Sequence, residues 1–199
     1  MKLFFKALCC GVVISCLLSL TGFCGACEDI ENRVLRLHII ANSDSETDQE
    51  LKLKVRDEIT EYTDQLFAGC KTKDDSIKAA EKNIDSIKEK ARSTLEKYGC
   101  HDEVDAYITN MSFDTRVYED FTLPSGNYDA LRIVIGEGKG HNWWCVLFPA
   151  VCVPSASEDI GSALTDEENE IVHDSDKYII KFKSIELFQN ISDFLSGLF

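Results

Sequence analysis

The stretch NYDALRIVIGEGKGHNWWCVLFPAVC, residues Asn127–Cys152, predicts two strands joined by a tight connection. In the segment LRIVI an apolar residue occupies every second position, which is typical of a strand with one buried face. The segment NWWCVLF, residues 142–148, is apolar on both faces, as in a central or doubly covered strand. Between them, Gly136, Gly138 and Gly140 predict a hairpin turn with positive φ at one or more glycines.

The same glycine-rich segment does not fit a nucleotide-binding loop. A phosphate-binding loop has a glycine, four further residues, Gly-Lys and then Ser or Thr. Here Ile133 takes the place of the first glycine, and Gly140 follows Lys139. The segment also lacks the third glycine and the following helix of a dinucleotide fingerprint. The sequence therefore predicts no nucleotide and no other cofactor.

Four cysteines of the body are disulfide candidates: Cys70, Cys100, Cys145 and Cys152. Sequence proximity pairs Cys70 with Cys100 and Cys145 with Cys152, although four cysteines allow three connectivities. The seven-residue spacing of the second pair, with Pro149 between its members, favours a disulfide over zinc binding or redox exchange. Alternatively, some of these cysteines are buried free thiols.

A third strand is predicted by RVLRLHIIANS, residues 33–43. Its leucines at 35 and 37 and the isoleucine at 39 alternate with Arg36 and His38. This alternation predicts one face in the core and one polar face. The strand is expected to end at residues 42–44.

Two long helices are predicted after this strand. A capping box of Thr47 with Glu50 begins the first helix, with Ser45 and Asp48 as an alternative frame. Apolar residues at helical spacing predict the second helix from residue 73 to a stop at Tyr98 and Gly99. Because each helix has a single apolar stripe, both are expected to cover a sheet.

The remaining segments complete an α+β domain. Strands are predicted at 103–113 and 115–121, a type I turn at 123–126, a strand at 176–183 and a helix at 184–199. The acidic segment at 157–172 has no assigned element. The predicted fold is a single α+β domain over residues 31–199, with a mixed or antiparallel sheet of about five to six strands covered by two long helices, and a C-terminal strand and helix.

The first residues have the order of a secretory signal peptide. Lys2 and Lys6 precede an apolar run, Leu8–Leu20, and small residues follow before the first acidic residues. Residues 1–26 are therefore expected to be a signal peptide or, if uncleaved, an N-terminal anchor. Cys27 resembles a lipoprotein acceptor only weakly. In each case the rest of the chain is expected to act across a membrane.

The body is strongly acidic. After the signal it contains 19 basic and 35 acidic residues, a formal charge of −16. Such a surface repels phosphate backbones and anionic lipid headgroups, so nucleic-acid binding is not expected. A basic or polar protein partner fits better, and solubility alone explains the charge equally well.

The sequence contains no recognisable catalytic constellation. Its histidines, His38, His101, His141 and His173, are scattered, and neither HExxH nor G-x-S-x-G is present. The sequence therefore predicts neither a metal site nor an enzyme. The alternative is an exported envelope-associated hydrolase that uses Asp44, His38 or His141.

The adjacent tryptophans indicate a partner-binding surface. In a strand, Trp143 and Trp144 point to opposite faces. One can enter the core, whereas a helix, the tail or another molecule must cover the other. Tryptophan is enriched at interface hot spots, so residues 136–144 are the first candidate surface and residues 42–48 the second. The candidate partner-binding residues are Asn42, Asp44, Glu137, Lys139, His141, Asn142, Trp143 and Trp144.

Two long segments resemble the stage II sporulation protein R family of endospore-forming bacteria. They are LRLHIIANSDSETDQELKLKVRD, residues 35–57, and LPSGNYDALRIVIGEGKGHNWWCVLFPAVC, residues 123–152. The similarity extends to KYIIKFKSIELFQ, residues 177–189, and so covers nearly all of the body. Residues 70–100 and the tail after 153 are less distinctive.

The resemblance implies a function that no motif indicates. Proteins of this family are exported from the forespore into the space between the forespore and mother-cell membranes. There they trigger a membrane-embedded aspartic protease of the mother cell. That protease processes the precursor of the early mother-cell sigma factor. The cysteine-rich signal leaves open whether this chain is released or stays tethered to the membrane.

Overall fold

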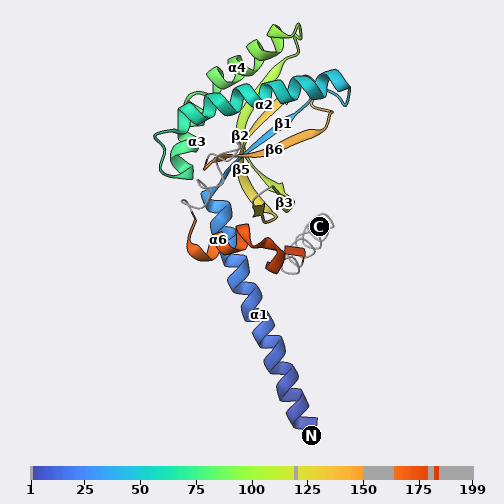
Figure 1. Ribbon diagram of the computed structural model, residues 1–199, viewed down its shortest axis with the longest axis vertical. Coiled ribbons are helices and arrows are strands. Elements are labelled where there is room, and N and C mark those ends of the chain that lie inside the picture. The colour runs from blue at the N-terminus through green and yellow to red at the C-terminus, as the bar shows by residue number, and fades with distance from the viewer. Residues whose placement is uncertain (1, 119–120, 150–163, 179–181, 184–199) are drawn as a thin grey trace, which may run out of the picture. The chain divides into compact units, whose positions relative to one another are not determined.

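The computed structural model describes residues 2–118, 121–149, 164–178 and 182–183 (Figure 1). The chain divides into two compact units. The larger unit comprises residues 31–112 and 127–164 and contains both candidate surfaces. The smaller unit comprises residues 1–30, 113–126 and 165–199.

The fold belongs to the predicted α+β class, and a four-stranded mixed sheet forms the larger unit. Strand β1 pairs in parallel with β5 and antiparallel with β6. The strands, in spatial order, are β2 (Val104–Phe113), β5 (Gly126–Ile135), β1 (Leu35–Ile40) and β6 (Asn142–Phe148).

Strand β1 is buried on both faces. All six of its residues are buried, including Arg36 and His38. The prediction of a single core face is therefore wrong, because the side chains on both faces of β1 are shielded from solvent. The guanidinium of Arg36 lies 4.9 Å from the ring centroid of Tyr128, which gives this buried cation an aromatic contact.

The hairpin predicted between β5 and β6 is also wrong. These two strands are not neighbours, because β1 lies between them. Leu37, at the middle of β1, lies opposite Leu131 of β5 on one side and Cys145 of β6 on the other. The connection that carries the glycines therefore passes the end of β1 instead of turning back directly. NWWCVLF, residues 142–148, is consequently an edge strand.

Three helices cover one face of the sheet (Figure 1). They are α2 (Glu46–Phe67), α3 (Lys73–Lys82) and α4 (Ile84–Lys97). The hydrophobic core lies between them and the sheet. Its fully buried members include Leu35, Leu37 and Ile39 of β1, Val55 and Ile59 of α2, Ile87 and Leu95 of α4, and Leu131 and Ile133 of β5.

The helix predicted from residue 73 onward is two helices that meet at Asn83. The backbone leaves the helical conformation there, with φ −112° and ψ 17°. Asn83 caps α3 because its N–H donates to the carbonyls of Ala79 and Ala80 at 3.2 and 3.1 Å. Its side-chain amide also donates to the Ala79 carbonyl at 2.8 Å. The predicted stop is confirmed, because Gly99 has φ +76° just after α4.

The smaller unit contains most of helix α1 (Lys2–Arg33), the pair β3 (Arg116–Val117) and β4 (Thr122–Leu123), helix α6 (Asp166–His173) and the 3-10 helix η1 (Ser175–Tyr178). Phe23 of α1 stacks on Tyr178 with ring centroids 5.5 Å apart. In the portion of the chain with described side chains, no helix has both the length and the apolar character needed to span a bilayer.

Several of the predicted elements in this unit differ from those in the structure. The strand predicted at 115–121 shortens to two residues, and the strand predicted at 176–183 begins instead in a 3-10 helix. Helix α6 was not predicted, although Thr165 and Glu168 form the capping box that could have revealed it. The helix predicted at 184–199 lies outside the described residues.

Helix α2 begins in the alternative capping frame. The Asp48 N–H donates to the hydroxyl of Ser45 at 3.1 Å, and Ser45 is the N-cap. We therefore expect Ser45→Ala to lower the free energy of unfolding by about 1 kcal/mol. Thr47→Ala, the matched control, should change it by less than about 0.5 kcal/mol. Urea unfolding of both variants measures this difference, and equal losses would refute the assignment of Ser45 as the cap.

Candidate partner-binding site

The two candidate surfaces form one structure, which we call the loop platform: residues 41–45 after β1 and residues 136–141 between β5 and β6. Backbone hydrogen bonds join them where the second segment passes the end of β1. The Lys139 N–H donates to the Asn42 carbonyl at 3.1 Å, and the Gly140 N–H donates to the Ala41 carbonyl at 2.9 Å. The Glu137 N–H donates to Oδ1 of Asn42 at 2.9 Å. The platform is therefore a single hydrogen-bonded surface.

The glycines of the platform allow this close approach. Gly136 has φ +56°, and a Cβ there would overlap the side chain of Asn42. A Cβ at Gly140 would overlap the backbone carbonyl of Ser43. The prediction of positive φ is confirmed at Gly136 and Gly138. The position of β1 between β5 and β6, which brings the two segments together, was not predicted.

Asp44 and His141 link the exposed ends of the two segments. The His141 N–H donates to Oδ1 of Asp44 at 2.6 Å, and Nδ1 of the ring contacts the same oxygen. The side-chain hydrogen bond from His141, followed by the backbone one, lowers the pKa of the Asp44 carboxyl. Both side chains remain mostly exposed, at 55% for Asp44 and 79% for His141. This pair is therefore available to a partner.

Helix α2 contacts the platform through Lys52, whose side chain is buried. Its ammonium group donates to the His141 carbonyl at 2.9 Å and to Oε1 of Gln49 at 2.5 Å. Gln49 in turn donates to the Ser43 carbonyl at 2.9 Å. Burial lowers the pKa of Lys52. Sequence reasoning missed Lys52, although its spacing of three residues from Val55 places it beside the apolar stripe of α2.

Asp48, in the first turn of α2, fixes the other side of the platform. Its Oδ2 accepts hydrogen bonds from the Ser43 hydroxyl at 2.5 Å and from the Asn42 amide at 3.2 Å. These bonds, with the Ser43 bond the stronger cause, lower the pKa of Asp48. An acidic residue at this position also interacts favourably with the helix N-terminus.

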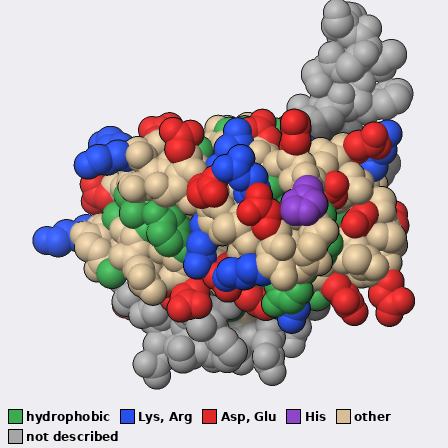
Figure 2. Space-filling view, turned by 90° about the horizontal axis from the view of Figure 1, so that it is seen from above, with side chains coloured by type: hydrophobic (Ala, Val, Ile, Leu, Met, Phe, Trp, Pro, Cys, Tyr) green, Lys and Arg blue, Asp and Glu red, His purple; other side chains and the backbone are tan. Residues whose placement is uncertain are grey.

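The outer surface of the platform is polar and carries both charges. Glu137 and Lys139 form an ion pair at 2.7 Å, and both side chains are exposed. Such a pair contributes little to stability. Figure 2 shows the same interspersion of acidic and basic side chains over the viewed face. The backbone holds the platform in place, and its exposed side chains are available for recognition.

Trp143 and Trp144 lie on opposite faces of β6, and each contacts a side chain of this chain. Trp143 lies on the helix side, where the guanidinium of Arg56 is 4.3 Å from its ring centroid. Trp144 stacks on His38 with centroids 3.9 Å apart and an interplanar angle of 1°. Both tryptophans are partly buried. Their role in binding a partner stays a prediction.

The three residues of the hydrolase hypothesis do not converge. Asp44 and His141 pair at the surface, whereas His38 is buried against Trp144. Among the described residues, no group of three or more His, Cys, Asp or Glu side chains is arranged to hold a metal ion.

The cysteines do not all follow the predicted pairing. Cys70 and Cys100 are free thiols that pack against the core, so the disulfide predicted between them is wrong. Burial raises the pKa of both thiols. Cys145 is disulfide-bonded, but Cys152 lies outside the described residues, and their pairing stays a prediction.

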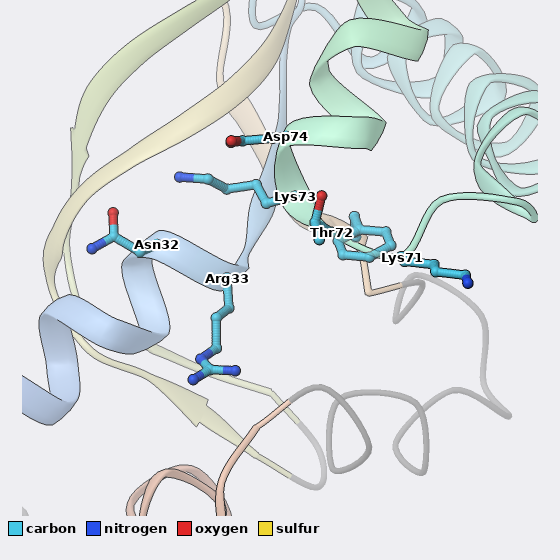
Figure 3. A pocket seen from close by; sticks show the side chains of 7 residues that line it. Asn32, Arg33, Lys71, Thr72, Lys73 and Asp74 are labelled. Carbon is cyan, nitrogen blue, oxygen red and sulfur yellow. The ribbon is translucent and has the colours of Figure 1, made fainter.

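A pocket of about 430 Å³ lies at the opposite end of β1 from the platform (Figure 3). It is lined by residues just before β1 and around the start of α3. In Figure 3, Lys73 extends toward Asn32, whereas Arg33 and Lys71 point elsewhere. Lys73 already pairs with Asp129 at 2.7 Å, so the pocket does not combine its cations into one site.

Fold and site define an α+β protein that presents an exposed, hydrogen-bonded loop surface. The family model described as stage II sporulation protein R matches residues 31–158, a range that includes the whole platform. The chain belongs to the stage II sporulation protein R family, which implies a role in sporulation.

The stage II sporulation protein R of Bacillus subtilis (strain 168) is 34% identical to this chain over 140 residues. The match covers 70% of this chain and 62% of that protein, so the chain spans less than two thirds of the length of this curated relative. No solved structure matches the chain significantly.

The glycine prediction can be tested at Gly140. We expect Gly140→Ala to lower the free energy of unfolding by about 1–3 kcal/mol, because the new methyl group meets backbone rather than a flexible side chain. Gly69→Ala is the matched control, since no atom lies within 4 Å of a Cβ built there. Urea unfolding measures both variants. A harmless Gly140→Ala substitution would contradict the close approach of the two segments.

The buried His38 predicts a pH dependence of stability. Burial, and then the charge of Arg132, lowers its pKa from 6.5 to about 4, whereas the nearby Asn142 side chain acts in the opposite direction. The fold thus favours the neutral ring. The contribution of neutral His38 to the free energy of unfolding is complete above pH 6.5. Up to about 3 kcal/mol of this free energy is lost as the pH falls toward 4, because the unfolded chain then binds a proton that the folded chain does not.

We therefore expect His38→Phe, which keeps an aromatic ring against Trp144, to lose less stability than the wild type between pH 6.5 and 4. Denaturant unfolding at several pH values measures the difference. His101→Phe is the control, because His101 is exposed. Parallel pH profiles for the wild type and His38→Phe would show that His38 does not titrate as the fold requires.

Proposed function

We propose that this chain is an exported signalling protein of endospore formation. It triggers a membrane-embedded aspartic protease of the mother cell, which then processes the precursor of the early mother-cell sigma factor. The observation that carries the proposal is membership of the stage II sporulation protein R family, whose matched segment includes both halves of the loop platform.

Export follows from the N-terminal segment. Residues 1–26 direct the chain from the forespore into the space between the forespore and mother-cell membranes. If the segment is not cleaved, it tethers the body, residues 31–199, to the membrane. The acidic body then faces the mother-cell membrane, where the protease lies.

In this proposal the platform is the contact surface, and activation is a shift in equilibrium. A ligand shifts a conformational equilibrium only by its difference in affinity for the two states. The chain therefore binds the active arrangement of the protease more tightly than the inactive one. A platform fixed by backbone hydrogen bonds and by Lys52 is preorganised, which lowers the entropic cost of association.

Recognition is assigned to the exposed side chains of the platform, Asp44, Glu137, Lys139 and His141. The partner-binding roles of Asn42, Asn142, Trp143 and Trp144 are secondary, because each is engaged within the chain or lies beside the platform. In the alternative, an exported envelope hydrolase, Asp44 and His141 would form the reacting pair. Their carboxylate–imidazole contact is the observation that favours it.

Reconstitution tests the proposal directly. The purified chain is combined with the protease and its sigma-factor precursor, and cleavage of the precursor is measured. We expect stimulation by the wild type, and at least about a fivefold loss for Lys139→Ala and His141→Ala, the loss for an interface residue worth 1 kcal/mol. Lys97→Ala and His101→Ala are matched controls on exposed residues outside the platform.

Each outcome separates the hypotheses. If the wild type does not stimulate cleavage, the signalling proposal fails. If the platform variants and controls behave alike, the protease contacts another surface. Release of envelope fragments by the wild type, lost in Asp44→Ala, would establish the hydrolase instead. A loss of stimulation with reductant would indicate that the disulfide of Cys145 is required.

A further inference from the structure

Strand β2 is the terminal strand of the four-stranded sheet, and among the described residues no strand pairs with its outer edge. We call this the free edge of β2. The strand has ten residues, which is long for an edge strand. It contains no proline, lysine or arginine, the residues that commonly protect an edge from further pairing. Side chains along it are exposed to solvent, namely Asp105, Tyr107, Asn110 and Ser112. The free edge is therefore open.

Contacts at the start of β2 show which of its backbone groups point outward. The Glu103 carbonyl accepts a hydrogen bond at 2.8 Å from the N–H of Gly136, the residue that follows β5. The Ala106 N–H instead donates to Oδ1 of Asp105 on its own strand, at 3.0 Å. Because these directions alternate along a strand, the N–H and C=O groups of the even-numbered residues, with Ile108 at the centre, point to the free edge. A further strand would pair with this row of donors and acceptors.

A hollow of about 570 Å³ lies between α4 and the start of β2. Lys88 in its lining pairs at 2.8 Å with Asp105, the residue that also binds the Ala106 N–H, so the hollow adjoins the free edge. Its other cation, Arg92, pairs with Glu89. The charged residues that line the hollow are four acids, Asp85, Glu89, Asp102 and Glu103, and two bases, Lys88 and Arg92. The hollow therefore has an excess of negative charge.

We propose that the free edge of β2 binds an extended segment of a protein partner, and that a lysine or arginine of this segment enters the hollow. In such strand addition, backbone hydrogen bonds supply affinity and a pocket for alternate side chains supplies specificity. Every second side chain of the added strand points to the side of the sheet that α4 covers. There the negative charge of the hollow favours a basic side chain.

The surface is continuous with the loop platform. Gly136 of the platform donates to the carbonyl of Glu103, which lines the hollow. A partner bound to the platform can therefore extend a segment along β2. The proposal goes beyond the platform contact, and it does not depend on the protease being the partner.

A second copy of this chain is the other strand that an open edge can recruit. Charge disfavours it, because the body carries a formal charge of −16 and pairing at β2 would bring two acidic hollows together. A second β2 also has no lysine or arginine to offer the hollow. The observations therefore favour a different protein with a basic segment.

The probe is the capped peptide acetyl-Thr-Val-Thr-Lys-Thr-Val-Thr-amide, added to the full chain. Its alternation places the lysine and both valines on one face of a strand. Replacing the lysine by glutamine gives the neutral match, and replacing it by glutamate gives the acidic one. Two further versions are N-methylated, one at the lysine and valines and the other at the threonines, so that each lacks the N–H donors of one edge.

Nitrogen–proton correlation spectra supply the readout. The backbone N–H signal of Ile108 reports on the free edge, and that of Leu37, in a strand with neighbours on both sides, is the internal reference. We expect the lysine peptide to shift the Ile108 signal saturably. The glutamine peptide should bind about threefold more weakly, the loss of a partly exposed ion pair, and the glutamate peptide more weakly still. Only one of the two N-methylated versions should lose binding, because only one edge of the peptide faces β2.

Variants of the hollow test the position of the basic side chain. The double variant Asp85→Asn with Glu103→Gln should weaken binding of the lysine peptide about threefold and leave that of the glutamine peptide unchanged. Both positions are exposed, so the fold should be retained. Glu96→Gln is the matched control, because Glu96 is exposed on the same helix but does not line the hollow.

The proposal is overturned if the lysine peptide gives no saturable shift, if the lysine and glutamine peptides bind equally, or if both N-methylated versions bind. It is also overturned if the double variant binds the lysine peptide as tightly as Glu96→Gln does. An Ile108 signal that shifts with the concentration of the chain alone would identify a second copy as the occupant instead. A positive result stands even if the chain fails to stimulate the protease in reconstitution.

Discussion

Strand β1 pairs with β5 on one edge and with β6 on the other, and the rest of the larger unit follows from this insertion. Because β5 and β6 cannot pair directly, their connection must pass the end of β1. The passage brings the Lys139 and Gly140 amides onto the carbonyls of Asn42 and Ala41, and this contact is the loop platform. Both faces of β1 are buried as well, so Arg36 and His38 lie inside the protein.

Local patterns allowed part of this arrangement to be predicted from the sequence. Alternation identified β1 and β5, and the content of β-branched and aromatic residues identified β2. The requirement for positive φ at the glycines was correct because it depends on neighbouring residues only. Pairing order depends on contacts between residues about 100 positions apart, such as Leu37 with Leu131 and Cys145, and GEGKG has the same local pattern in a hairpin and in a crossing. The stop at Gly99 was predictable, but the break at Asn83 was not, because the apolar spacing continues through it.

The candidate site was predicted as two separate surfaces. The sequence indicated its exposed residues, but it did not indicate the hydrogen bonds and buried side chains that hold them together. Asn42, Asp44 and His141 lie together as parts of the platform. The supports were missed because they are polar residues in an otherwise ordinary amphipathic helix. Lys52 is the clearest case: a lysine beside an apolar stripe usually extends to solvent, and its hydrogen bonds to the His141 carbonyl and to Gln49 explain its burial.

In the platform, the residues that hold its shape differ from the exposed residues that are available to a partner. This difference determines how variants of the chain can be interpreted. Its shape depends on backbone amides, on Gly136 and Gly140, and on the buried Lys52, so changes at these positions alter folding and binding together. Glu137, Lys139 and His141 project outward with contacts that contribute little to stability. A loss of function caused by a substitution at these exposed positions therefore indicates a lost contact with a partner. A loss caused by a substitution at Gly136, Gly140 or Lys52 indicates first that the platform has shifted relative to β1.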